Sequence, residues 1–123
     1  MGQYVVVENE GRWCFNLCAS NGHILVSSII FPSQDECLKG IDCLRKEAGN
    51  AAIEDSTIDA FDREATPKYR IYEDFEGHYF FRFITNEAGD IARSHTYANK
   101  DSLYRRIERM SAEADSPLAA PEV

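Results

Sequence analysis

The sequence has little of what marks a membrane-spanning, secreted or metal-bound protein. No stretch approaches the ~18 apolar residues that a membrane helix needs, and the opening MGQYVVVENEGR lacks the basic segment of a signal peptide. The four cysteines include no Cys-x-x-Cys pair, and no histidine stands near them at zinc-finger spacing. We therefore expect a cytoplasmic protein with reduced thiols, and no membrane contact, metal or cofactor.

The chain also lacks the excess of positive charge that is typical of nucleic-acid-binding domains. Its 13 Lys and Arg against 21 Asp and Glu give a net charge of −8. Residues 1–66 carry −6 (5 basic, 11 acidic) and residues 67–123 only −2 (8 basic, 10 acidic). The less acidic half holds a candidate basic patch of Arg93, His95, Arg105, Arg106 and Arg109. This patch is either a solvated helix face or a site for phosphate or an acidic partner.

Recognisable catalytic arrangements are missing as well. The sequence has no nucleophile elbow and no glycine-rich phosphate loop. His23 and His78 stand beside turn glycines, where a solvated loop histidine is the ordinary case. The carboxylates between residues 42 and 64 belong to a helix exterior and a linker, which favours a solvated acidic face over an acid–base pair. We therefore predict no catalytic residue and no enzymatic activity.

What the sequence does contain is an internal repeat with a spacing of 66 residues, obtained by aligning Gly11 with Gly77 (77 − 11 = 66). The alternating large apolar residues of 12–18 then fall on those of 78–84, which predicts the same strand twice. Downstream, two stripes with the spacing i, i+4, i+7, i+11 predict two matching helices. The stripes are Cys37, Ile41, Leu44 and Ala48, and Leu103, Ile107, Met110 and Ala114.

Each unit is expected to contain a first strand, at 4–7 or 69–72, then a two-stranded hairpin and a helix. The first hairpin turns at Asn21-Gly22. Its helix starts at a capping box of Ser33 and Glu36, and the second helix is capped by Asn99. Gly40, in mid-helix, indicates a close approach of helix and sheet. We divide the chain into a first repeat (1–55, with a short strand at 51–55), a linker (56–68), a second repeat (69–114) and a loose tail (115–123).

The stretch FNLCASNGHILVSS, the helix ending GIDCLRKEA and the following AAIED resemble the YegP-like family of small bacterial proteins of unknown function. The matching positions of the first unit are Phe15, Leu17, Ala19, Asn21, Gly22, Ser28, Gly40 and Ile41. The second unit keeps Phe81, Phe83, Ser94, Tyr97 and Ile107 but lacks the Asn-Gly turn and the helix glycine. The resemblance implies an α+β fold of tandem β-β-β-α-β units that share one antiparallel sheet about a pseudo-twofold axis. It also implies that the last strands are exchanged and that both helices pack on one face, and it implies no catalytic residue.

The other face of these strands is unusually apolar. A sheet with one wet face alternates cleanly between apolar and polar residues, and these strands do not. The candidate interaction surface comprises Phe80, Arg82, Ile84, Cys14, Cys18 and Ile29. Either the linker or tail covers this face, or another protein or a second copy docks on it.

Three classes of function remain open. The leading one is a non-catalytic protein-interaction or accessory module with an unknown protein partner, acting as a monomer or weak homodimer. The alternative is nucleic-acid binding or mimicry, through the second-repeat arginines with nearby tyrosines or through the acidic surface. The third class is an uncharacterised small enzyme.

Overall fold

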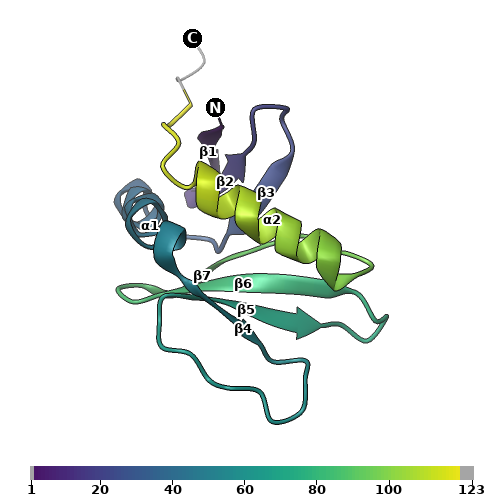
Figure 1. The fold of residues 1–123 in the computed structure, drawn as a ribbon. Helices are drawn as coiled ribbons and strands as arrows, with labels where there is room; N and C mark the ends of the chain where they lie inside the picture. Colours follow the sequence, from purple (N-terminus) through teal and green to yellow (C-terminus); the bar gives the residue numbers. More distant parts are fainter. Residues whose placement is uncertain (1, 120–123) are drawn as a thin grey trace.

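The computed structural model describes residues 2–119 as one seven-stranded sheet with two α-helices (Figure 1). The first half contains β1 (Gln3–Asn9), β2 (Arg12–Cys18), β3 (Ile24–Ser28), α1 (Gln34–Glu47), the short 3₁₀-helix η1 (Ala48–Asn50) and β4 (Ala52–Asp55). The second half contains β5 (Lys68–Glu73), β6 (Tyr79–Thr85), β7 (Gly89–Arg93) and α2 (Lys100–Glu113). The strand order is β1-β2-β3-β7-β6-β5-β4, so the fold is α+β as predicted. No helix among residues 2–119 is both long and apolar enough to cross a membrane.

The sheet is antiparallel, as the resemblance implied, except at one edge, where a parallel pair makes it mixed. β4 pairs with β5 in parallel, whereas the other neighbouring strands are antiparallel. Strands joined by a tight hairpin must be antiparallel, but a parallel pair needs a connection of about a dozen residues. The segment 56–67, between β4 and β5, is a connection of that length.

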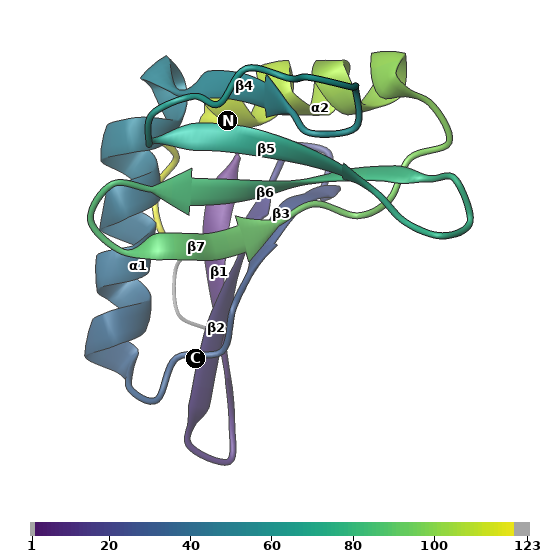
Figure 2. The ribbon, with the colours of Figure 1, turned by 90° about the horizontal axis from the view of Figure 1, so that it is seen from below.

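Both helices pack on one face of the sheet and begin at the predicted caps (Figures 1 and 2). The Ser33 hydroxyl accepts the Glu36 N–H at 3.2 Å, and the Asn99 side chain accepts the Ser102 N–H at 2.9 Å. All eight residues of the two helix stripes are buried in the core, together with Phe15 and Leu17 of β2 and Phe81 and Phe83 of β6. The periodicities therefore assigned the helix and strand faces correctly.

Gly40 allows the close contact that the sequence indicated. A Cβ atom at this position would lie 2.8 Å from Cζ of Phe31, closer than ordinary packing allows. At the matching position of α2, Arg106 lies over the ring of Tyr97 instead, 5.6 Å from its centroid. At equivalent positions, α1 thus packs closely on Phe31 because Gly40 has no side chain, whereas α2 places the long side chain of Arg106 on Tyr97.

Residues 115–119 are not loose, contrary to the prediction. The Tyr4 N–H donates to Pro117 O at 2.9 Å, and the Ala119 N–H donates to Tyr4 O at 2.8 Å. Backbone groups at a sheet edge need partners, and Pro117 can join this edge because only its carbonyl is used. Residues 120–123 of the predicted tail lie outside the described residues.

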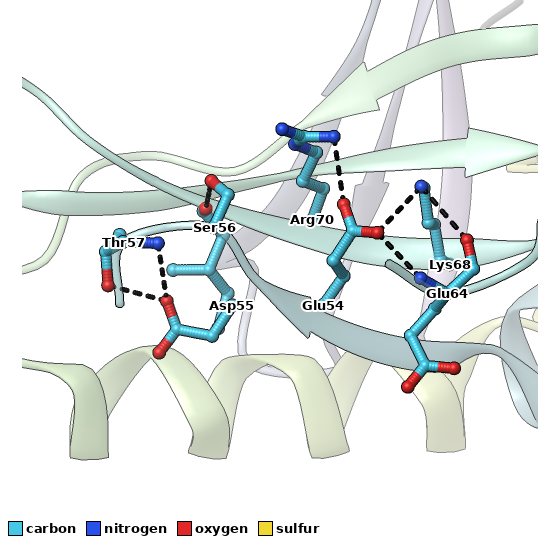
Figure 3. Close-up of polar contacts among 8 residues, drawn as sticks. Glu54, Asp55, Ser56, Thr57, Glu64, Lys68 and Arg70 are labelled. Carbon is cyan, nitrogen blue, oxygen red and sulfur yellow. Dashed lines mark hydrogen bonds and ion pairs between the residues drawn. The ribbon is translucent and has the colours of Figure 1, made fainter. Parts of the chain in front are cut away.

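The segment 56–67 also does more than connect β4 to β5. The Arg70 guanidinium lies 5.4 Å from the centroid of the Phe61 ring, and the Glu64 N–H donates to the Glu54 carboxylate at 2.8 Å. Figure 3 shows Glu64 beside Glu54 and Lys68. The linker therefore packs against the β4–β5 end of the sheet.

Candidate interaction surface

Three arginines lie in register across adjacent strands of the second half. Arg70 on β5 is opposite Arg82 on β6, which is in turn opposite Arg93 on β7. Phe81 and Phe83, which alternate with Arg82 along β6, are buried in the core on the helix side. Because side chains alternate along a strand, the three arginines share the face away from the helices.

Two aromatic rings lie beneath these arginines. Tyr72 and Phe80 are cross-strand neighbours whose rings stack at 5.4 Å with an interplanar angle of 16°. The guanidiniums of Arg70 and Arg82 lie 5.4 and 5.7 Å from the Tyr72 centroid, and that of Arg93 lies 5.2 Å from the Phe80 centroid. These are cation–π distances, and a guanidinium packed on a ring keeps in-plane N–H groups for acceptors. We call these five residues the guanidinium face.

The three arginines differ in how their charge is balanced. Arg70 Nη1 lies 2.9 Å from the carboxylate of buried Glu54 (Figure 3), and Arg82 Nη1 lies 2.9 Å from Asp90 in a half-exposed pair. Within residues 2–119, Arg93 forms no ion pair with a carboxylate. The positive charge available to a ligand is therefore greatest at Arg93.

Glu54 anchors the β5 end of the face as an ionised group. Burial alone would raise the pKa of Glu54, but the Glu64 N–H, the Lys68 ammonium at 3.0 Å and the Arg70 guanidinium hold that pKa below its ordinary value. Asp55, the next residue, instead meets Lys100 at the start of α2, 2.7 Å away. Adjacent carboxylates of β4 thus tie the strand to opposite faces of the sheet.

An open hollow of about 250 Å³ adjoins Arg93 where the two halves of the sheet meet. Its lining consists of Ser27, Arg93, Ser94, His95 and Thr96. β3 and β7 pair there through only two residue pairs, Ser27 with Arg93 and Ser28 with Ala92. Figure 2 shows the strands of the two halves running in very different directions across this seam, which explains the short pairing.

The six residues of the predicted interaction surface do not form one patch. They are Phe80, Arg82 and Ile84 on β6, Cys14 and Cys18 on β2, and Ile29 in the loop after β3. β3 and β7 lie between β2 and β6. Ile29 is 47% exposed, and the other five are half-buried. The β6 group belongs to the second half, where the linker packs Phe61 on Arg70 and contacts the β6–β7 turn through Thr66, whose hydroxyl lies 3.0 Å from Asn86 Oδ1.

The predicted basic patch is also divided. Arg93 and His95 line the hollow, whereas Arg105, Arg106 and Arg109 belong to α2, which packs on the opposite face of the sheet. Arg109 is further engaged by Glu113 at 3.3 Å. Arg70 and Tyr72 were not predicted as site residues, although the alternation of KYRIYE puts both on one strand face. Placing them beside Arg82 required the register of β5 against β6.

A second cluster gathers Cys43, Glu47 and Glu87, whose possible ligand atoms all lie within 4.8 Å of one another. Burial, and after it the carboxylates of Glu87 and Glu47, raise the pKa of the Cys43 thiol. Lys39 and Lys46 line the adjoining hollow. The absence of a metal site stays a prediction.

Comparison with known proteins gives consistent matches. The family described as "Domain of unknown function (DUF1508)" matches residues 8–55. A UPF0339 protein from Methanosarcina acetivorans is 37% identical over 49 residues, which make up 40% of this chain and 84% of that protein. The solution structure of the Escherichia coli protein of unknown function yegP has a TM-score of 0.75 at 19% identity. A UPF0339 protein from Shewanella oneidensis has a TM-score of 0.76 at 13% identity. Each alignment covers 95% of this chain and 89% of the solved one, and these likenesses show the fold.

Proposed function

Since this chain belongs to the YegP-like UPF0339 family, which contains the domain of unknown function DUF1508, we propose its function from its own surface. The protein is a non-catalytic interaction module that binds an acidic segment of a partner protein on the guanidinium face. The observation that carries this proposal is the row of three arginines in register over a stacked tyrosine and phenylalanine.

Charge and composition support an acidic occupant. Arg82 and Arg93, with Lys68 and Arg70 beside them, supply four cations, while Glu54 and Asp90 supply two carboxylates, a local balance of +2 on a chain of net charge −8. Tyr, Phe and Arg are enriched in the cores of protein–protein interfaces. A partner rich in Asp and Glu would be steered to this spot and away from the rest of the surface.

The arrangement of the rings favours a protein over a single-stranded nucleic acid. Nucleic acids bind such faces by stacking bases on exposed aromatic rings. Here the Tyr72 and Phe80 rings stack on each other and carry guanidiniums, so a base would have to displace them. Carboxylates need only the N–H groups that remain.

Binding of a labelled peptide rich in Asp and Glu, followed by fluorescence anisotropy, tests this proposal. Losing one charge-assisted hydrogen bond costs about 1.5 kcal/mol or more, so Arg93→Gln and Arg82→Gln should each weaken binding by about tenfold. Arg105→Gln, on exposed α2 surface, is the matched control and should bind as the parent does. Equal binding by all four proteins would refute the proposal, and tighter binding of an oligothymidylate would favour the nucleic-acid alternative.

The apolar part of the face can be tested separately. Changing Phe80 and Ile84 together to Ser should leave the monomer folded and weaken peptide binding or self-association, because both side chains are only half-buried. Sedimentation of the parent protein should show a monomer or weak homodimer. An unfolded double variant would show that these side chains are needed for the fold itself, and unchanged binding and association would show that Phe80 and Ile84 contribute to neither.

We also infer that the two halves are structural repeats related by a pseudo-twofold axis. In support, the Tyr4 hydroxyl donates to Ala114 O at the end of α2 (2.7 Å), and the Tyr69 hydroxyl donates to Ala48 O at the end of α1 (2.8 Å). The register shifts after positions 17 and 83, which are 66 residues apart, also correspond. An experimental structure in which 12–48 did not superpose on 78–114 would refute this inference.

The remaining parts of the proposal concern where and how the protein works. We propose a cytoplasmic protein that has no cofactor and no catalytic residue. Stoichiometric metal or small molecule in the protein purified under native conditions would argue for the enzyme alternative. A tagged chain found in the membrane or periplasmic fraction would contradict the cytoplasmic location.

A further inference from the structure

We propose that the hollow at the β3–β7 seam is an oxyanion site that receives a phosphorylated side chain of the partner protein. This inference rests on the proposed function, because the hollow adjoins the guanidinium face and shares Arg93 with it. The inference means that the protein recognises one phosphoryl group of the partner as well as the partner's acidic charge in general.

The lining of the hollow supplies donors and no carboxylate, although the chain holds 21 acidic residues. Arg93 brings a guanidinium without a carboxylate partner among the described residues, His95 an imidazole and Thr96 a hydroxyl. The Ser27 hydroxyl already donates to Asn16 Oδ1 at 2.7 Å and the Ser94 hydroxyl to His95 O at 2.8 Å. Within residues 2–119, the backbone N–H groups of His95 and Thr96 donate to no protein acceptor. An unpaired N–H group and a guanidinium can both donate to an oxyanion, and such charge-assisted hydrogen bonds are strong.

The matching position of the first half shows that this opening is specific to one side of the seam. His95 corresponds to Ile29 at the 66-residue spacing, and the Ile29 N–H donates across the seam to Ile91 O at 2.9 Å. The corresponding bond, from the His95 N–H to Leu25 O, is not formed among the described residues. The seam is therefore closed at Ile29 and open at His95, where the polar lining lies.

A phosphoryl group suits this lining better than a carboxylate does. A phosphorylated side chain carries about −1.5 to −2 charges and three acceptor oxygens near neutral pH. It can accept from the Arg93 guanidinium, the Thr96 hydroxyl and an unpaired backbone N–H, and such charge-assisted hydrogen bonds are stronger than neutral ones. A planar carboxylate has two oxygens for the same set of donors.

The experiment compares three labelled acidic peptides. They have the same sequence except at the central residue, which is Ser, Glu or phosphoserine. The phosphoserine peptide should bind about tenfold more tightly than the Glu peptide, a gain of about 1.4 kcal/mol. The double variant His95→Gln, Thr96→Val should lose that gain and retain the binding of the Glu peptide. Ile29→Gln, at the matched position of the closed side, should retain both. In ¹H–¹⁵N spectra the amide signals of His95 and Thr96 should shift on binding, and that of Ile29 should not.

The outcomes separate this inference from the proposed function. Binding of the Glu peptide that depends on Arg82 and Arg93, without a gain from phosphoserine, overturns the oxyanion site and leaves the function standing. Failure of all three peptides overturns both. If inorganic phosphate alone shifts the same amides while the phosphoserine peptide binds no better than the Glu peptide, the hollow is a free-anion site and the partner-based inference is wrong. Preference for an oligothymidylate over the phosphoserine peptide would overturn it in favour of a nucleic-acid phosphate.

Discussion

Replacing Glu54 by Gln should destabilise the protein severely at neutral pH. The carboxylate has no exposed surface and meets the Lys68 ammonium at 3.0 Å and the Arg70 guanidinium at 2.9 Å. Removing one partner of a buried ion pair costs roughly 3–5 kcal/mol, because it leaves the other charge uncompensated. Lys68 and Arg70 keep 12% and 23% of their side-chain exposure, so part of their charge remains solvated. We therefore expect the lower end of that range, about 3 kcal/mol.

The loss should be visible as a fall in Tm and should depend on pH. An unfolding entropy of about 2.1 cal/mol/K per residue converts 3 kcal/mol in a chain of 123 residues to roughly 12 °C. Because the pKa of Glu54 is lowered in the folded state from its ordinary 4.5, its contribution is fully present above pH 4.5 and is lost as the pH falls below that value. The parent should therefore lose stability in acid more steeply than the Glu54→Gln variant does.

Urea unfolding followed by circular dichroism, at neutral pH and on the acid side of pH 4.5, measures both effects. Asp59→Asn is the control, because it removes one negative charge from the exposed part of the same linker. It should change the free energy of unfolding by less than about 0.5 kcal/mol. A loss below ~1 kcal/mol for Glu54→Gln, or the same loss on both sides of pH 4.5, would refute the assignment of Glu54 as a buried, ionised anchor.

Three further predictions concern the core, the helix ends and the cysteines. Ile41→Ala and Ile107→Ala should each cost ~2–5 kcal/mol in urea unfolding because both side chains are buried, and a loss below ~1 kcal/mol would contradict the packing. Tyr4→Phe and Tyr69→Phe should each cost about 1–3 kcal/mol by leaving a buried carbonyl of a helix end unpaired, and losses that differed widely would count against equivalent repeats. When the protein is purified under native conditions and then denatured, thiol titration should count four free cysteines. A count of two, or a stoichiometric zinc signal from the purified protein, would overturn the expectation of reduced, metal-free thiols.

Local patterns in the sequence predicted most of the secondary structure and the core. The alternation in 12–18 and 78–84, the helix stripes through Ile41 and Ile107, and the caps at Ser33 and Asn99 all depend on residues within a few positions of one another. Steric preferences and solvent exclusion act on such short stretches directly, so they can be read before the fold is known. The YegP-like resemblance rests on these same stretches.

The candidate site depended on pairings between distant segments, which only the tertiary structure decided. Arg70, Arg82 and Arg93 share a face because β5, β6 and β7 are neighbours in one register, and a one-residue slip would turn one of them into the core. The parallel placement of β4, the docking of 117–119 on β1 and the open seam at His95 likewise depend on which edges meet. Local propensity does not specify these meetings, because they result from the joint packing of both helices and seven strands around one core.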